Sequence, residues 1–376
     1  MKLCVFPNDP LRSYYEKGEI KKRYFNPKNM FKEVHVISLF DDDIDEEKVK
    51  SVAGEAKFQI HITGKVNLLN KNKMKKKVLE IIKKINPDVI RSYNPLLQGW
   101  MAAKIKQEMG IPLVISLHGD YDRDLRFQSK KKHDYKSFLK LQISKQILEK
   151  FSLSNTDEVI IIYEFIRDYA ESMGAKSINL IYNRIDLNQF SPDVTPAFKE
   201  KIPVIICVGR LIKEKNQECL IKAIEDLDVK LVLIGNGVEY ENLRSLTKKL
   251  GIEHKVKFET SVPNSKIQHS YAAADIFALP IKYGGFAIPA LEAAASGIPV
   301  ILPKQEFDPN PDLVNKFAMF VDNNPKEFEK AISKVLSDSK MREKMIKDGL
   351  DTVKLIHSDI MEEKEKNLYL KVIKKN

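Results

Sequence analysis

The stretch from residue 274 to residue 303 constrains the fold of this chain more than any other. A short apolar run ends at Pro280, two glycines follow, and an alanine-rich run begins near Pro289. Proline is tolerated in the first turn of a helix, because the N–H group that it lacks has no partner there. Gly297 ends the alanine-rich run, and a second apolar run follows it. The pattern predicts a strand, a glycine turn, a helix and a second buried strand.

The predicted glycine turn has the properties of an anion site. A turn that enters a helix leaves several backbone N–H groups free at the positive end of the helix dipole, which most often binds phosphate. The residues of this turn are Gly284, Gly285, Phe286, Ala287 and Ile288. Glu292 lies one turn inside the helix, too deep to cap it. We expect its carboxylate to accept hydrogen bonds from sugar hydroxyls.

A second strand-end loop supplies cations. The apolar run 202–208 ends at Gly209, which permits a sharp turn, and Arg210 and Lys215 follow in the loop. Arginine offers a bidentate fork and lysine a point charge, a combination that suits a diphosphate. We therefore expect both side chains to reach one anion from the mouth of the loop.

A third glycine turn, Gly235-Asn236-Gly237, follows the predicted strand 230–234. Three turns at strand ends in one half of the chain are typical of a ligand crevice at the carboxyl ends of a parallel sheet. The sequence therefore predicts a binding site assembled from these turns.

The N-terminal half also alternates between strand and helix patterns. Its predicted strands are residues 2–6, 33–39, 58–62, 89–92, 113–117, 158–163 and 178–181. Alternating strands and helices predict a parallel sheet with helices on both faces. A second series begins at Pro203, after a polar stretch that Pro192 and Pro196 interrupt. A chain of 376 residues also exceeds the usual size of one core, so we expect two α/β domains.

Positive charge is concentrated in residues 51–150, which hold 21 Lys and Arg against 9 Asp and Glu. Two segments, 70–86 and 130–150, carry most of it, and both show the pattern of a basic amphipathic helix. One interpretation is a pair of solvated surface helices, and another is a face that meets an anionic membrane. Nucleic acid is not expected as a partner, because the interleaving of arginine and aromatic residues that is typical of a base-reading surface is missing.

Cysteine and hydropathy patterns limit the cellular setting. The three cysteines form no Cys-x-x-Cys pair and no Cys/His metal spacing, so we expect no metal site and a reduced compartment. The N-terminal apolar run is short and broken by Pro7, unlike a signal peptide. No apolar run approaches the length of about 18 residues that spans a membrane. We expect a cytoplasmic protein, located at the inner face of the membrane if the basic helices dock there.

The joint order of four fragments resembles the nucleotide-sugar glycosyltransferases of the GT-B fold, specifically glycosyltransferase family 4 (glycosyl transferases group 1). The fragments are Gly-Arg-Leu-x-x-x-Lys at 209–215, Gly-x-Gly at 235–237, Ala-Asp-Ile-Phe-x-Leu-Pro at 274–280 and Gly-Phe-x-Ile-Pro-x-Leu-Glu-Ala at 285–293. The resemblance covers most of residues 200–355. It implies two Rossmann-like α/β domains whose parallel sheets face a cleft: an acceptor-binding domain at 1–190, a donor-binding domain at 200–355, and a helix at 356–376 that crosses back onto the first domain.

The resemblance also assigns site residues. Arg210 and Lys215 would hold the diphosphate of a nucleoside-diphosphate sugar, and Glu292 would bind the ribose hydroxyls. The backbone of Gly285, Phe286 and Ala287 would face the phosphate and the sugar. The remaining donor-site positions are Gly209, Gly235, Gly237, Gly284 and Ile288.

In the first domain the resemblance points to His118, which follows the predicted strand 113–117. Its imidazole would hydrogen-bond the donor sugar or the acceptor hydroxyl. The alternative is that His118 is a structural residue of a strand-end turn.

Three departures from the family pattern affect substrate assignment. Gly284 stands where the family usually has a glutamate that faces the donor sugar, which favours either an altered donor or a catalytically silent relative. Arg184 replaces the glycine of the family's Asn-Gly-Ile/Val-Asp turn, and the turn would be strained if it required a positive φ at that residue. The glycine-rich loop that usually follows the first strand is replaced by Pro7-Asn8-Asp9-Pro10.

The sequence thus predicts a retaining hexosyltransferase-like enzyme that moves a sugar from a nucleoside-diphosphate sugar to a hydroxyl of a glycan, glycolipid or lipid-linked acceptor. Polysaccharide or lipopolysaccharide assembly is the natural setting, and no metal or other cofactor is expected. A silent nucleotide-sugar-binding relative and a nucleotide-sugar epimerase on the same fold remain alternatives. The epimerase would need acid and base residues that the sequence does not identify.

Overall fold

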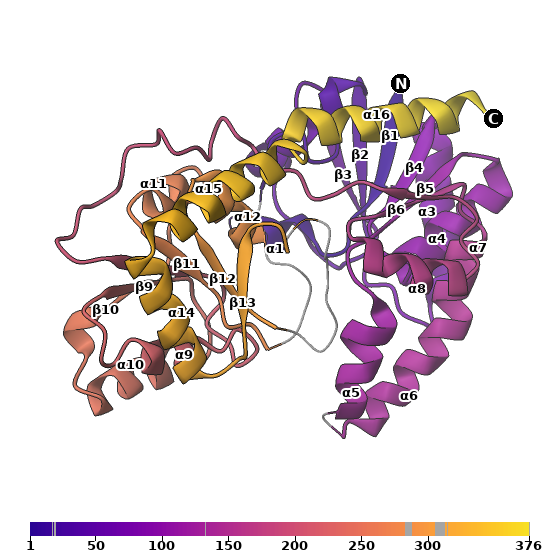
Figure 1. Cartoon of the computed structure of the whole chain (residues 1–376). Coiled ribbons are helices and arrows are strands. Elements are labelled where there is room, and N and C mark those ends of the chain that lie inside the picture. Colours follow the sequence, from indigo (N-terminus) through magenta and orange to yellow (C-terminus); the bar gives the residue numbers. More distant parts are fainter. Residues whose placement is uncertain are drawn as a thin grey trace. The chain divides into compact units, whose positions relative to one another are not determined.

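The computed structural model describes residues 1–16, 18, 20–131, 133–282, 288–304, 313 and 315–375. These residues form two compact units (Figure 1). Unit 1 comprises Met1–Tyr182 and Asp359–Asn376, and unit 2 comprises Asn183–Ser358. Each unit is an α/β structure built on one parallel sheet, as the alternating pattern predicts.

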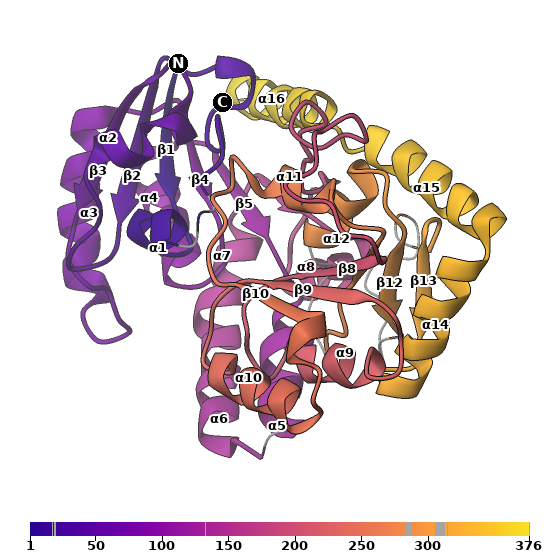
Figure 2. The same cartoon turned by 90° about the vertical axis from the view of Figure 1, so that its left-hand side faces the viewer.

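The sheet of unit 1 has seven parallel strands in the order β3-β2-β1-β4-β5-β6-β7. Figure 2 labels β3, β2, β1, β4 and β5 of this sheet. In the interior strand β1, Leu3 pairs with Val34 on one side and with Val89 on the other. Residues 3–6 are fully buried, as expected for a strand covered on both faces. The strands are β1 (Lys2–Phe6), β2 (Glu33–Ser38), β3 (Lys57–Ile62), β4 (Val89–Ser92), β5 (Leu113–Leu117), β6 (Glu158–Ile161) and β7 (Ile178–Leu180).

Helices connect these strands and cover the sheet. Helix α4 ends at Gly110, which has φ +72° and donates its N–H to the Lys106 carbonyl at 2.8 Å, an ending that favours glycine. The helices are α1 (Leu11–Glu16), α2 (Glu46–Val49), α3 (Lys71–Ile85), α4 (Leu97–Met109), α5 (Gln128–Lys131), α6 (Tyr135–Ser144), α7 (Lys150–Ser154), α8 (Arg167–Ser172) and α16 (Ser358–Lys374).

The basic segment 130–150 is a helical hairpin, so the prediction of one continuous helix was wrong. Helix α5 ends at Lys131, His133 has a left-handed φ of 57°, and α6 begins at Tyr135. Asp134 caps α6, because its carboxylate accepts the Ser137 N–H at 3.0 Å. π-Helical turns precede α5 at Asp122–Phe127 and follow α6 at Lys145–Glu149.

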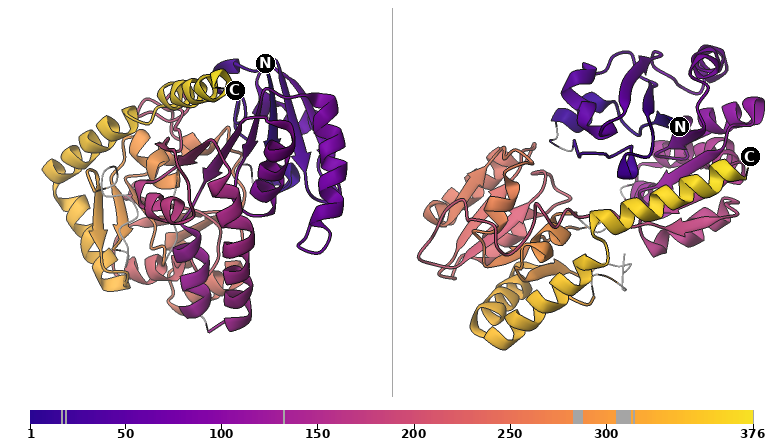
Figure 3. Two further views of the ribbon diagram at one scale, coloured as in Figure 1. Left: turned by 90° about the vertical axis from the view of Figure 1, so that its right-hand side faces the viewer. Right: turned by 90° about the horizontal axis from the view of Figure 1, so that it is seen from above.

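The last helix, α16, packs on unit 1 (yellow in Figure 3). Arg91 of β4 donates to the Glu365 carboxylate at 3.0 Å and to the Tyr369 hydroxyl at 2.8 Å. Tyr369 is fully buried and makes an edge-on contact with Phe31 at 5.2 Å between ring centroids. This helix therefore contributes core and buried polar contacts to unit 1.

The sheet of unit 2 has six parallel strands in the order β10-β9-β8-β11-β12-β13. The order reverses between β8 and β11, so the carboxyl ends of these two strands flank the switch point, where ligands of such sheets bind. The strands are β8 (Val204–Val208), β9 (Lys230–Ile234), β10 (Val256–Glu259), β11 (Ile276–Ala278), β12 (Val300–Pro303) and β13 (Ala318–Val321).

Helices of unit 2 follow the same βα alternation. Arg184, at the entrance of this unit, is not among the residues with positive φ, so its turn does not need a glycine there. The helices are α9 (Gln217–Ala223), α10 (Tyr240–Lys249), α11 (Ile267–Tyr271), α12 (Ile288–Ala295), α14 (Pro325–Ser337) and α15 (Ser339–Lys354).

Candidate functional site

Two strand-end loops of unit 2 interlock at the carboxyl ends of β8 and β9. Gly209 donates its N–H to the Ile234 carbonyl at 2.9 Å, and Leu211 donates to the Asn236 carbonyl at 2.9 Å. The loop after β8 therefore lies directly against the turn Gly235-Asn236-Gly237. The sequence predicted both turns but gave no sign that they bond to each other.

Close backbone contact explains why this turn contains two glycines. A Cβ atom on Gly235 would lie 2.2 Å from the Gly209 carbonyl oxygen, and one on Gly237 would lie 2.2 Å from that of Leu211. Both distances are far inside van der Waals contact, and Gly235 also has a φ of +140°. Any side chain at these positions would push the two loops apart and displace the residues that follow Gly209.

The loop after β8 presents two cations of different character. Arg210 is exposed, whereas Lys215 is half-buried and runs along Gly209. Within the described part of the chain, neither side chain forms an ion pair or a side-chain hydrogen bond. Burial lowers the pKa of Lys215, and the charge of Arg210 lowers it further, while Cys207 acts in the opposite direction. An anion bound here would relieve the repulsion between the two cations.

A set of amides fixes the shape of this loop. Buried Gln217 donates to the Arg210 carbonyl at 3.0 Å. Asn216 donates to the Asn323 side chain at 3.1 Å, and Asn323 donates to the carbonyls of Pro280 and Ile281 at 3.1 Å each. These bonds connect the loop to the segments after β11 and β13. Sequence reasoning missed Gln217 and Asn323, although an asparagine two residues after a strand end is a signal that could have been examined.

The helix predicted after the glycine turn is α12, and it holds Glu292 in place. The buried Tyr271 hydroxyl of α11 donates to the Glu292 carboxylate at 2.9 Å. Burial and the nearby carboxylate raise the pKa of Tyr271, so the tyrosine remains a neutral donor. Glu292 itself is half-buried. Tyr271 was not predicted, because nothing in the sequence of α11 marks it as a partner of Glu292.

Ile288 is the first residue of α12, so its predicted place at the start of the helix agrees with the structure. The other predicted turn residues, Gly284, Gly285, Phe286 and Ala287, lie outside the described residues. Gly297 has φ +72° and donates to the Ala294 carbonyl at 3.1 Å, which ends α12 where the sequence predicts.

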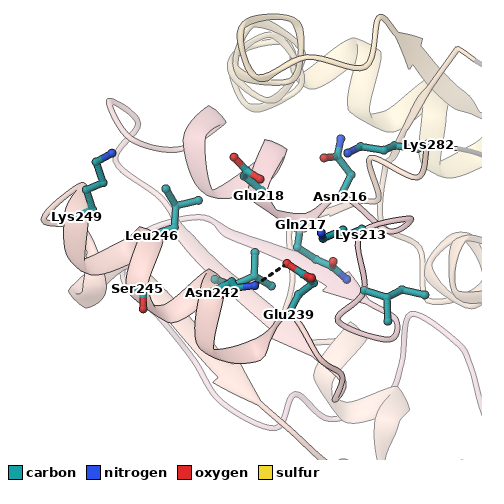
Figure 4. A pocket seen from close by; sticks show the side chains of 12 residues that line it. Lys213, Asn216, Gln217, Glu218, Glu239, Asn242, Ser245, Leu246, Lys249 and Lys282 are labelled. Atoms are coloured by element: carbon teal, nitrogen blue, oxygen red, sulfur yellow. Dashed lines mark hydrogen bonds between the residues drawn. The ribbon is translucent and has the colours of Figure 1, made fainter. Parts of the chain in front are cut away.

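A hollow of about 400 Å³ lies between α9 and α10 of the same unit (Figure 4). Its lining includes Lys213 and Asn216 of the β8 loop, together with Lys282. Two further lining residues are joined by a hydrogen bond, in which Asn242 donates to the Glu239 carboxylate at 3.1 Å. Neither Arg210, Lys215 nor Glu292 contributes to this lining. The hollow therefore adjoins the candidate site and does not coincide with it.

His118 belongs to unit 1 and follows β5, at the carboxyl edge of that sheet. Its imidazole is exposed on one side and stacks on Tyr93 at 5.6 Å between ring centroids. Desolvation by the protein atoms around the ring lowers the pKa of His118, and the charge of Arg91 lowers it further. Tyr93 follows β4, the strand beside the switch point of this sheet. The structure thus places His118 at a sheet edge suited to ligands, in a different unit from the other site residues.

No cluster of three or more His, Cys, Asp or Glu side chains with metal-binding geometry occurs among the described residues. In the same part of the chain, no helix is long and apolar enough to cross a membrane.

The two units define an α/β protein with a parallel sheet in each unit. Residues 32–189 match the family model described as Glycosyltransferase Family 4, and residues 193–351 match Glycosyl transferases group 1. The two ranges together span most of the sequence. The chain belongs to the family 4 glycosyltransferases of the GT-B fold.

Curated relatives match parts of the chain. The GDP-mannose-dependent alpha-(1-6)-phosphatidylinositol monomannoside mannosyltransferase of Mycobacterium tuberculosis is 28% identical over 205 residues, which cover 48% of this chain and 52% of that protein. An uncharacterized glycosyltransferase of Methanocaldococcus jannaschii is 30% identical over 239 residues, 57% of each chain. The chain spans about half the length of the first curated relatives that it matches.

Solved structures agree with the GT-B fold. Sucrose-phosphate synthase from Thermosynechococcus elongatus superimposes with a TM-score of 0.75 at 16% identity, over 100% of both chains. The Anabaena protein HepE, solved in complex with UDP, gives a TM-score of 0.75 at 16% identity, over 99% of this chain and 100% of that one. At such low identity the likeness establishes the fold alone.

Proposed function

We propose that this protein is a retaining glycosyltransferase that uses a nucleoside-diphosphate sugar and transfers the sugar to a hydroxyl of a glycan, glycolipid or lipid-linked acceptor. In this proposal residues 200–355 bind the donor and residues 1–190 bind the acceptor. The observation that carries it is the pair of Arg210 and Lys215, unpaired within the described chain and held at the switch point of unit 2.

In this proposal Arg210 and Lys215 stabilise the leaving group of the transfer reaction. The acceptor oxygen bonds to the anomeric carbon as the bond from that carbon to the β-phosphate oxygen breaks, and the electron pair stays with the diphosphate. The hydroxyl proton passes to the departing phosphate. Negative charge therefore grows on the diphosphate, where Arg210 and Lys215 stabilise it more strongly than they stabilise the ground state.

Glu292 and Tyr271 have a binding role in the proposal. The carboxylate of Glu292 accepts hydrogen bonds from the ribose hydroxyls, and Tyr271 is a positioning residue that fixes the carboxylate from behind. In unit 1, His118 hydrogen-bonds the sugar or the acceptor hydroxyl, and its lowered pKa keeps it neutral near pH 7. A neutral imidazole can both donate and accept a hydrogen bond.

The relatives suggest which substrates to test first. Several are named as GDP-mannose-dependent enzymes that act on phosphatidylinositol mannosides, and others as D-inositol 3-phosphate glycosyltransferases. GDP-mannose with a glycolipid acceptor is therefore our first candidate pair. Gly284 removes the carboxylate that usually faces the donor sugar, so we expect a sugar preference that differs from that of most family members.

A thermal-shift panel with GDP, UDP, ADP and their sugar conjugates tests the donor site. A ligand at about 100 times its Kd stabilises the native state by about 2.7 kcal/mol, which raises Tm by about 5–10 °C for a domain of this size. Lys215→Ala should weaken binding of the effective nucleotide by about 10- to 100-fold, the value of one charged hydrogen bond.

Lys213→Ala is the matched control, because Lys213 is an exposed lysine of the same loop that lies on the adjoining hollow. Equal losses of nucleotide affinity in the two variants would contradict the assignment of Lys215 to the diphosphate. If no nucleotide shifts Tm, the donor site itself is wrong. If a donor binds tightly but no glycosylated product forms with any acceptor extract, the protein is a silent relative, and the glycine at position 284 becomes the residue to restore to glutamate.

A further inference from the structure

Helix α6 leaves a row of large apolar side chains uncovered. Consecutive members lie four positions apart, which places them on one side of the helix and of the π-helical turn that continues it. No residue of α6 is buried. The row, which we call the apolar stripe, consists of Tyr135, Leu139, Ile143 and Ile147, with exposed fractions of 64%, 62%, 45% and 46%.

Lysines accompany the apolar stripe on its exposed side. Lys136 and Lys140 of α6, and Lys150 at the start of α7, are exposed and form no ion pair within the described part of the chain. Lys145 differs, because it turns inward to the Asp122 carboxylate at 2.5 Å. Asp134 is the acid next to these lysines, and the charges of Lys136 and Lys140 contribute to lowering its pKa. The exposed face thus combines apolar groups with an excess of positive charge.

A buried polar network holds this face outward. Arg126 donates to the Glu149 carboxylate at 2.5 Å and to the Leu141 carbonyl at 3.2 Å, which fastens α6 to the turns before and after it. The buried Tyr169 of α8 donates to Glu149 at 2.5 Å. Figure 1 shows α5 and α6 extending away from the strands of unit 1. Rotating the apolar stripe inward would require breaking these bonds.

We propose that the apolar stripe and its lysines dock unit 1 on an anionic membrane surface. A basic amphipathic helix binds such a surface by inserting its apolar face at the headgroup boundary, while lysines contact anionic lipids. A second copy of the chain fits less well, because a symmetric contact between two stripes would bring Lys136 and Lys140 of both copies together. The proposal concerns a surface and does not depend on the transfer reaction.

Co-sedimentation with vesicles tests the proposal. The probes are vesicles of phosphatidylcholine alone and vesicles in which about a third of the lipid is phosphatidylglycerol. The full chain should bind only the anionic vesicles. Leu139→Gln with Ile143→Gln removes apolar contact and should lower the partition coefficient at least about tenfold. Lys136→Glu with Lys140→Glu should lower it by a similar factor or more.

The matched control is Lys73→Glu with Lys76→Glu on helix α3, which makes the same change in net charge at two exposed lysines. If this pair weakens binding as much as the α6 lysine pair, adsorption follows total charge and the proposal fails. It also fails if the full chain ignores anionic vesicles, or if the glutamine variant binds as the wild type does. A dimer in light scattering that Leu139→Gln dissociates would assign the stripe to a second copy instead.

A fluorescence measurement distinguishes insertion from loose adsorption. The chain has one tryptophan, Trp100, which is buried in α4. Leu139→Trp adds a reporter in the apolar stripe, and its emission should shift to the blue when anionic vesicles are added. An unchanged emission spectrum, with the protein bound to the vesicles, would contradict insertion of the stripe.

Discussion

Helix α3 turns its apolar side chains inward, whereas α6 leaves its apolar side chains in contact with solvent. In α3, Val78 and Ile82 are fully buried and Ile85 nearly so, while Leu79 and Ile81 are half-buried. In α6 no residue is buried. Both helices are rich in lysine and apolar residues at helical spacing. The comparison teaches that periodicity identifies an apolar face, while the neighbouring elements decide whether that face is core or surface.

The comparison implies that different forces hold the two helices. The α6 hairpin depends on the buried network of Arg126, Glu149 and Tyr169, and α3 depends on apolar burial. Substitution of a buried group should therefore lower stability in either place, whereas substitution in the apolar stripe should weaken surface binding and leave stability nearly unchanged.

Arg126→Met should have the largest effect. It leaves the fully buried carboxylate of Glu149 without its cation, and breaking a buried pair in this way costs about 3–5 kcal/mol. Urea unfolding of the variant and of Lys136→Met, an exposed lysine on the same hairpin, measures the difference. Similar midpoints for the two variants would show that the network does not hold the hairpin.

Ile82→Ala should be next, with a loss of about 2–5 kcal/mol from the cavity left under α3. Leu139→Ala in α6 removes a similar volume but should change the free energy of unfolding by no more than about 0.5 kcal/mol, because that side chain is largely exposed. Equal losses would mean that the apolar stripe is covered in solution, and the contrast between the helices would disappear.

The smallest effect concerns pH and lies beneath α3. His35 and His61 approach to 3.1 Å and line a hollow together with Ile81 and Lys84 of α3. Burial lowers the pKa of both imidazoles below 6.5, and the hydrogen bond that His35 donates to the Glu33 carboxylate only partly offsets this for His35. The charges of Lys2 and Lys57 also lower the pKa of His35, and the charge of Glu46 raises the pKa of His61.

With folded pKa values below the unfolded one, the unfolded chain binds more protons in this range. The contribution of each histidine is therefore fully present above pH 6.5 and is lost as the pH falls through the folded pKa, by at most about 1.4 kcal/mol per pH unit. Urea midpoints between about pH 7.5 and about pH 5.5 should fall more for wild type than for His35→Gln with His61→Gln. An equal fall in both proteins would place the titrating groups elsewhere.

Much of the fold could be predicted from the sequence, because short apolar runs bounded by glycine and proline leave few alternatives to buried parallel strands. β1, β4, β5 and β9 have the predicted bounds. The hairpin was missed because lysines continue through the turn and hide it. The signal available in the sequence was Asp134, because aspartate is a residue type that caps helices, and it caps α6 in the structure.

The site was partly predictable for a similar reason. Gly209, Gly235 and Gly237 stand out in a sequence because glycine marks sharp turns and close backbone approach. The structure shows close approach at Gly235 and Gly237 and a positive φ at Gly209. Tyr271 and Asn323 could not be found, because their partners are distant in sequence and depend on which strands become neighbours. The roles of Arg210, Lys215, Glu292 and His118 in binding and transfer stay predictions that the nucleotide and acceptor assays decide.

The helix α16 has a consequence for the order of events during synthesis. Residues 1–182 are translated before unit 2, yet Arg91 finds Glu365 and Tyr369 only after those two residues have emerged. Until then the nascent first unit lacks Tyr369, and the guanidinium of Arg91, which is buried in the complete protein, lacks its partners on α16. Unit 2 can complete its sheet in the meantime, so the half of the protein that is translated first is the half that matures last.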